Sequence, residues 1–396
     1  MVAAVALVLP MPGALGAARV PRIRSFTASA EHIHAGERLT LSWRVEGARR
    51  IVLRPDIGVV RRNSIEVAPS EDTTYELIAT GGGERVRARL PISVLPPHGP
   101  FIDERRIPPA QPGFAADRVR ATAELPGASD GTGAFRTVCT FSHMNFDDPI
   151  VAPGRSRASH LHTFFGNTAT DAASTASSIA STGDSTCRGG TVNRTAYWTP
   201  ALIDTLDGSP ITPSASHFYY KTGYRGVAPG DVQPLPEGLR IVAGSKDARA
   251  AQPGVTRWKC VGGDDSLVGA SIPDCRAGSE LWQEIFFPQC WDGVHLDAPD
   301  HRSHMAYPDG GCPSTHPVAI PEISFNIVYP VMRIGQTRTW RLSSDAYNAR
   351  MPGGYSSHAD WFNGWRPEVV DAWVTGCEQA ALDCHSHLLG DGREIF

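Results

Sequence analysis

Several common features are missing from this chain of 396 residues. No cysteine precedes Cys139, no Cys-x-x-Cys pair occurs, and lysines and arginines are scattered rather than clustered. The missing pair argues against a structural zinc site of the usual spacing, and the scattered charge argues against a nucleic-acid groove or a polybasic membrane face. After the N-terminal segment, no apolar run reaches the ~18 residues of a membrane span. We expect a monomer with no nucleic-acid partner and no membrane span.

The N-terminal segment and the cysteines indicate export. An apolar run at residues 2–9 is followed by small residues, as in the cleavage region of a signal peptide, although no Lys or Arg precedes it. We therefore predict a signal peptide at residues 1–18 and a secreted protein. The even number of cysteines, eight, predicts disulfides. Short sequence loops favour three pairs and leave a fourth: Cys260 with Cys275, Cys290 with Cys312, Cys377 with Cys384, and Cys139 with Cys187.

Two regions can be separated by pattern. Residues 24–95 show short runs of alternating apolar and polar residues between turn residues, which is typical of a small β-sandwich. Residues 96–135 are rich in proline and glycine and are predicted to be a linker. Residues 136–396 show weak helical periodicity and many short β-like runs. The predicted fold is mainly β, with a small sandwich followed by a larger β-sandwich or jelly-roll-like domain whose long loops are pinned by disulfides.

Both regions resemble known families. The strings LTLSWRVEGA, IEVAPSEDTTYELIATGGG and VRARLPISV resemble bacterial immunoglobulin-like modules. The strings FSHMNFDDPIVAPGRSRASHLHTFFGNT, QCWDGVHLDAPDHRSHMAYP and HADWFNGW resemble the family called domain of unknown function 1996, over about residues 138–380. That resemblance implies an extracytoplasmic protein, frequently joined to wall-binding or carbohydrate-binding modules. It implies no activity.

The segment from Ser142 to Asn167 is the first candidate site. It contains His143, Asp148, His160 and His162 among prolines and glycines. If residues 159–164 form a strand, His160 and His162 point to the same face, as metal ligation or paired proton transfer requires. We therefore consider a divalent metal at His160 and His162, completed by His143, His304 or an aspartate, although no cofactor follows from the sequence with certainty.

Two later segments carry further candidates. Asp292 and His304 belong to a short stretch that is dense in histidine and aspartate. His358 and Asp360 are two residues apart, so on a strand they share a face, where a carboxylate can orient an imidazole. Together with the first segment, they form a candidate acid–base set.

Such a set suits chemistry on a hydroxylated substrate. Aromatic rings offer faces on which sugars stack, and we predict a substrate surface made by Tyr197, Trp198, Tyr220, Arg240, Trp291 and Trp365. The leading hypothesis is a secreted protein that cleaves a polysaccharide or cell-wall glycan, as a hydrolase with two carboxylates or as a lyase. A non-catalytic glycan-binding or structural wall protein and a His-ligated metalloenzyme are the alternatives.

Overall fold

The computed structural model describes residues 20–30, 32–34, 38–69, 72–95, 100–128, 130–263, 265–345 and 352–396. The chain divides into two compact units, unit 1 (Met1–Pro97) and unit 2 (His98–Phe396). The signal peptide predicted at residues 1–18 lies outside the described residues. No helix in the described ranges is both long and apolar enough to cross a membrane.

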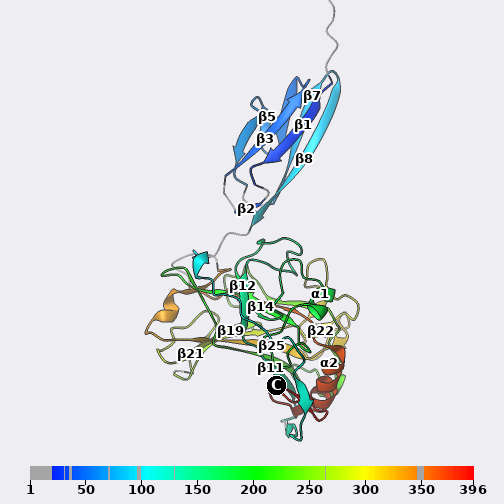
Figure 1. The fold of residues 1–396 in the computed structure, drawn as a ribbon, viewed down its shortest axis with the longest axis vertical. Helices are drawn as coiled ribbons and strands as arrows, with labels where there is room; N and C mark the ends of the chain where they lie inside the picture. Colours follow the sequence, from blue (N-terminus) through cyan, green and yellow to red (C-terminus); the bar gives the residue numbers. More distant parts are fainter. Residues whose placement is uncertain are drawn as a thin grey trace, which may run out of the picture. The chain divides into compact units, whose positions relative to one another are not determined.

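Unit 1 consists of two sheets around one core (Figure 1). The three-stranded sheet has the order β1 (Arg22–Ala28), β3 (Leu39–Glu46), β6 (Ser64–Val67), and the five-stranded sheet has the order β2 (His32–His34), β8 (Glu84–Leu95), β7 (Thr73–Gly81), β4 (Arg50–Arg54), β5 (Gly58–Val60). Leu41 and Trp43 from the first sheet pack with Leu53 and Leu77 from the second. The core arises from the alternation along β3, in which Leu39, Leu41 and Trp43 are buried and the residues between them are more exposed.

Unit 2 is built on a large sheet and a smaller one. The eight-stranded sheet has the order β10 (Gly127–Ala128), β28 (Leu382–Asp383), β11 (Gly133–Val138), β17 (Ala215–Thr222), β25 (Glu322–Pro330), β21 (Glu280–Phe286), β19 (Thr256–Val261), β20 (Val268–Gly269). The five-stranded sheet has the order β12 (Phe141–Asn145), β13 (His162–Gly166), β14 (Ala196–Pro200), β27 (His358–Phe362), β18 (Arg240–Gly244). The prediction of a mainly β protein is confirmed.

Short elements complete unit 2. Small sheets join β16 (Ser209–Ile211), β15 (Leu202–Asp204) and β26 (Trp340–Leu342); β23 (Met305–Ala306), β22 (Cys290–Trp291) and β24 (Val318–Ala319); and β29 (Arg393–Ile395) with β9 (Val119–Ala121). The helices are α1 (Ala176–Ser181), α2 (Pro367–Trp373), the π-helical η4 (Val374–Gln379), and the 3-10 turns η1 (Glu104–Arg106), η2 (Pro229–Asp231) and η3 (Gln336–Thr339).

The composition of residues 96–135 predicted a linker, but part of this interval forms paired strands. From this interval, β9 pairs with β29, β10 with β28, and β11 with β17. Proline and glycine therefore interrupt short strands here. The segment is part of unit 2 from residue 100 onwards.

The two large sheets of unit 2 pack face to face. The ring of Tyr197 on β14 stacks on Phe218 of β17 with 3.9 Å between centroids, and the indole of Trp361 on β27 donates to the hydroxyl of Tyr220. Because side chains alternate along a strand, the neighbours of Tyr197 and Trp361 point away from this core. The five-stranded sheet therefore has a second buried face, where Phe164, Trp198 and Val242 form a separate apolar cluster.

Strand β13 is buried on both faces. Phe165 joins the core between the sheets, whereas Phe164 joins the cluster on the opposite face. Gly166 ends the strand with a φ of 80°, and a Cβ at that position would lie 2.0 Å from the carbonyl oxygen of Thr195. No other residue type fits there without backbone movement.

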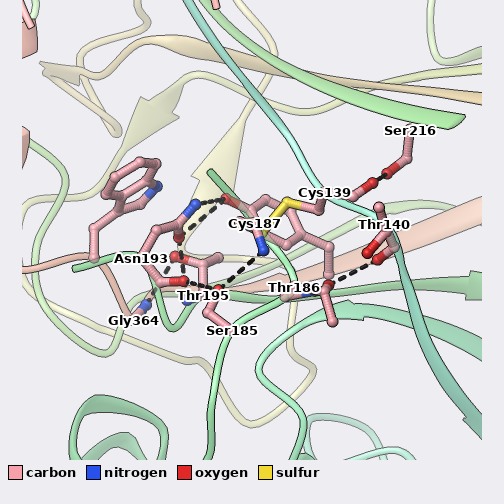
Figure 2. Close-up of a disulfide and its surroundings, with 12 residues drawn as sticks. Cys139, Thr140, Ser185, Thr186, Cys187, Asn193, Thr195, Ser216 and Gly364 are labelled. Atoms are coloured by element: carbon pink, nitrogen blue, oxygen red, sulfur yellow. Dashed lines mark hydrogen bonds between the residues drawn. A yellow bond between two sulfur atoms is a disulfide. The ribbon is translucent and has the colours of Figure 1, made fainter. Parts of the chain in front are cut away.

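The four predicted disulfides are all present. Figure 2 shows Cys139–Cys187, which joins cysteines 48 residues apart at an isolated antiparallel bridge. Around it, the Thr186 hydroxyl donates to the carbonyl oxygen of Thr140 (2.7 Å), and the Ser216 hydroxyl donates to that of Cys139. The disulfide therefore fastens the loop before β14 to the junction between β11 and β12.

Candidate functional site

A buried polar cluster lies on the outer face of the five-stranded sheet. His162 starts β13, and His358 and Asp360 belong to β27, two strands away. His160 lies in the loop just before β13, and Asp148 lies in the loop after β12. We call these five residues the His/Asp cluster. None of the five is more than 5% exposed.

The three imidazoles are in direct contact. The ring centroids of His160 and His162 are 4.2 Å apart, and those of His160 and His358 are 4.9 Å apart. One nitrogen from each of the three rings lies within 4.8 Å of the others. The same holds for ligand atoms of Asp148, His162 and Asp360. Two overlapping three-residue sets with metal-ligating geometry therefore share His162.

Backbone carbonyls determine the tautomers of two of these rings. Nδ1 of His162 donates to the carbonyl oxygen of Asp147 (2.9 Å), and Nδ1 of His358 donates to that of Ser356 (2.7 Å). In a neutral imidazole, Nε2 then carries the lone pair. Metal-ligating histidines show this pattern, because the second ring nitrogen is held by an outer partner. Within the described structure, Nε2 of His160 and of His162 is buried without a hydrogen-bond partner.

The loop that carries Asp148 is held by carboxylate–backbone hydrogen bonds. Oδ1 of Asp148 accepts from the amides of Ile150 (3.0 Å) and Val151 (2.9 Å), which leaves Oδ2 for the cluster. The carboxylate of Asp147 accepts from the amides of Arg157 and Ala172. Asp147 therefore supports the loop, whereas Asp148 contributes to the cluster.

Asp360 is the least satisfied group of the cluster. Both of its carboxylate oxygens are buried without a hydrogen-bond partner in the described residues. Burial, and then the negative charge of Asp148, raise the pKa of Asp360 well above its usual value, and the positive charge of Arg302 opposes this only in part. A buried carboxyl group without a hydrogen-bond partner costs about 1–3 kcal/mol or more. A bound cation would remove this cost.

Burial lowers the pKa of the histidines, whereas it raises that of Asp360. It lowers the pKa of His160 and His162, and it lowers the pKa of His358 to about 3. The three rings are therefore neutral near pH 7, which is the form that binds metal ions and accepts protons.

This protonation state predicts a pH-dependent stability. The unfolded chain protonates His358 below about pH 6.5, whereas the folded chain does so only near 3. The contribution of His358 to the free energy of unfolding is therefore most favourable above about pH 6.5. It falls by about 1.4 kcal/mol per pH unit as the pH decreases. We expect His358→Gln to reduce the slope of the wild-type protein by about 1.4 kcal/mol per pH unit below about pH 6.5, measured by urea unfolding in chelator; His160 and His162 contribute the remainder. His316→Gln, at the surface, should leave the slope unchanged, and equal slopes in all three proteins would contradict the prediction.

Comparison with known proteins identifies the family of unit 2. The model of the family "Domain of unknown function (DUF1996)" matches residues 148–365, more than half of the chain, and this range includes the whole His/Asp cluster. The chain belongs to the DUF1996 family. No curated protein matches it. A solved structure titled "Structural basis for the promiscuous specificity of the carbohydrate-binding modules from the beta-sandwich super family" aligns at a TM-score of 0.22 and 11% identity, over 87% of this chain and 97% of that one. At this score the alignment supports no functional argument.

Three predicted members of the acid–base set do not join the cluster of this DUF1996 unit. Nδ1 of His143 contacts the Ser142 hydroxyl, and its Nε2 donates to the carbonyl oxygen of Thr170. Asp292 closes a turn by accepting from the backbone and ring of His295. Nε2 of His304 donates to the carbonyl oxygen of Arg240. These three residues lie outside the His/Asp cluster, and Nδ1 of His304 is buried without a hydrogen-bond partner among the described residues. A catalytic role for them stays a prediction.

Most of the predicted substrate surface is wrong, because the rings are in the core. Tyr197, Trp198 and Tyr220 are fully buried, and Trp365 is 2% exposed. The Tyr220 hydroxyl receives the indole N–H of Trp365 (2.9 Å). The faces of these rings pack against protein and cannot stack on a sugar.

The other two predicted substrate residues lie nearer the surface. Arg240 forms an ion pair with Asp297 (3.1 Å) and covers the ring of Phe362. Trp291 is partly exposed, and its indole donates to the carbonyl oxygen of His295. Contact of either residue with substrate stays a prediction.

The structure adds Arg302, which the sequence pattern does not single out. Its guanidinium donates to the carbonyl oxygen of Gly244 (2.6 Å), and Gly244 lies opposite His358 in the β18–β27 pair. The charge of Arg302 acts on both His358 and Asp360. The sequence could have pointed to Arg302 through its position between His301 and His304, because that segment is rich in histidine.

Proposed function

We propose that unit 2 is a metal-dependent enzyme that cleaves a polysaccharide, with a divalent transition-metal ion bound by His160, His162, His358 and Asp360. The observation that carries this proposal is the presence of buried, unpartnered ligand atoms on His160, His162 and Asp360, together with two sets of converging ligand atoms that share His162. The sets are His160, His162 and His358, and Asp148, His162 and Asp360. Three imidazoles with a carboxylate suit zinc or a neighbouring transition metal.

The chain's own groups supply the remaining requirements. The carbonyl oxygens of Asp147 and Ser356 hold two imidazoles in the tautomer that presents Nε2. Asp148 lies within reach of His162 and Asp360 and can take a proton from a water molecule or a substrate hydroxyl. A bound ion would supply Lewis-acid chemistry. The four disulfides support a secreted protein that acts outside the cell, on a wall glycan or another polysaccharide.

A second function is favoured by one observation. Because no residue of the His/Asp cluster is more than 5% exposed, an ion held there would be largely enclosed, as structural ions are. Unit 2 would then be a metal-stabilised glycan-binding protein without turnover.

Elemental analysis and turnover assays separate these functions. We expect protein purified without chelator to hold about one transition-metal ion per chain, and His160→Ala to lose the ion and its activity on a polysaccharide panel. New reducing ends report cleavage, and the absorbance of a new C=C bond distinguishes a lyase from a hydrolase.

His316→Ala, at a partly exposed histidine outside the cluster, is the matched control and should retain both properties. Stoichiometric metal without turnover would support the structural function. An ion-free protein whose activity survives His160→Ala would reject the metal centre.

A further inference from the structure

A separate pocket lies on the other side of unit 2. Along β17, Phe218 and Tyr220 point into the core between the sheets. Tyr219 and Lys221 therefore point outward from the eight-stranded sheet. Glu322 on β25 lies directly opposite Lys221 in the strand pairing. The His/Asp cluster lies on the outer face of the five-stranded sheet, so both sheets separate it from this pocket.

The pocket has a volume of about 360 Å³. This is the lower part of the range of small-molecule sites, roughly 300–1,000 Å³, and suits one or two sugar rings. Its walls combine cations, aromatic rings and one carboxyl group, and are formed mainly by Lys221, Tyr224, Arg225, Arg257, Phe286 and Glu322.

The cations of this pocket outnumber its acids. Lys221 makes no ion pair among the described residues, and its Nζ lies 4.5 Å from the centroid of Tyr219. Within the described ranges, the side chain of Arg225 donates only to the carbonyl oxygen of Gly254 (3.0 Å). Arg257 is neutralised by Glu284, which also binds Lys259. Lys221 and Arg225 therefore remain available to an anionic ligand.

Glu322 is a buried acid without a partner. It is 7% exposed, lines the pocket, and makes no hydrogen bond or ion pair with the described protein. Burial raises its pKa, and the positive charges of Arg225 and Lys221 oppose the rise. A polar group so placed normally has a hydrogen-bond partner. A ligand hydroxyl in the pocket would provide one.

We infer that this pocket binds a uronate residue of an acidic polysaccharide, with its carboxylate at Lys221 and Arg225 and a hydroxyl at Glu322. Tyr224, 38% exposed, and the partly exposed Phe286 offer surfaces to the apolar side of a sugar ring. A neutral sugar would leave the two cations unmatched, and inorganic phosphate would leave the aromatic walls and Glu322 unused. The inference does not depend on a metal in the His/Asp cluster.

Titration calorimetry with the full chain tests the site. The probes are trimers of galacturonate, glucuronate, mannuronate and guluronate, a neutral glucan trimer, and sodium phosphate. At least one uronate trimer should bind about tenfold more tightly than the neutral trimer, since one lost charge-assisted contact is worth about tenfold. Lys221→Met and Arg225→Gln should each weaken it by at least about tenfold.

Arg333→Gln is the matched control, since Arg333 is exposed and pairs only weakly with Asp204 (3.7 Å); its binding should stay within about twofold of wild type. Binding should also survive chelator, which distinguishes this site from the His/Asp cluster. The inference is overturned if no uronate trimer binds, if the neutral trimer binds equally, if phosphate competes as well as the uronate, or if both pocket variants bind like wild type.

Discussion

Asp360→Asn is expected to raise the melting temperature of metal-free protein and to lower that of metal-loaded protein. Without an ion, the wild-type chain must bury a carboxyl group that has no partner and whose pKa is raised. Replacing it by a neutral amide should stabilise the fold by about 1–3 kcal/mol. With an ion, the same carboxylate is a ligand, and a free concentration of about 1,000 times Kd stabilises the wild type by about 4 kcal/mol. Calorimetric melting with chelator and with added zinc measures both effects.

Asp297→Asn provides the matched control. Asp297 is paired with Arg240 and with His301 and lies outside the cluster. Its replacement should cause a similar small loss of stability in chelator and in zinc. If Asp360→Asn instead shifts the melting temperature equally in the two conditions, Asp360 is not a metal ligand.

Removing the Cys139–Cys187 disulfide is expected to be the most destabilising disulfide loss in the chain. Its two cysteines are 48 residues apart, so the chain-entropy model assigns about 4 kcal/mol to the link. The double substitution to serine also loosens the loop before β14, which Thr186 holds to Thr140. The free energy of unfolding from denaturant titration, followed by tryptophan fluorescence, measures the loss.

The Cys377–Cys384 disulfide, with a separation of 7, is the control for loop length. The same model assigns it only about 2 kcal/mol. Double serine variants of the two pairs should therefore differ in unfolding free energy by roughly a factor of two. Equal losses would show that the loop length of Cys139–Cys187 does not determine its contribution.

Sequence periodicity was sufficient to predict which residues share one face of a strand. His358 and Asp360 were predicted to point the same way, and both join the cluster on β27. For His160 the reasoning was incomplete, since the strand begins only at His162 and His160 reaches the cluster from the preceding loop. Convergence of segments about 200 residues apart in sequence depends on sheet order, which a single sequence does not contain.

The aromatic residues show why a substrate surface is harder to predict. Trp198 and Tyr220 are chemically suited both to stacking on sugars and to filling a core, and their local sequence is the same in either case. Tertiary packing decides between the two: the packing of one sheet on the other buries Tyr220, and the apolar cluster on the outer face of the five-stranded sheet buries Trp198. The position of Lys221 opposite Glu322 could not be predicted for a similar reason, because the two residues are brought together only by the pairing of β17 with β25.

The burial of β13 on both faces has a consequence for how the His/Asp cluster is assembled. A strand that is exposed to solvent on one face tolerates a shift in register better than a strand that is buried on both faces. A shift of one residue in β13 would move the imidazole of His162 into the aromatic layer and place Phe165 or Thr163 against His358 and Asp360. The packing that buries the imidazole therefore also fixes its position, and a shift of β13 would disrupt both the core of unit 2 and the His/Asp cluster.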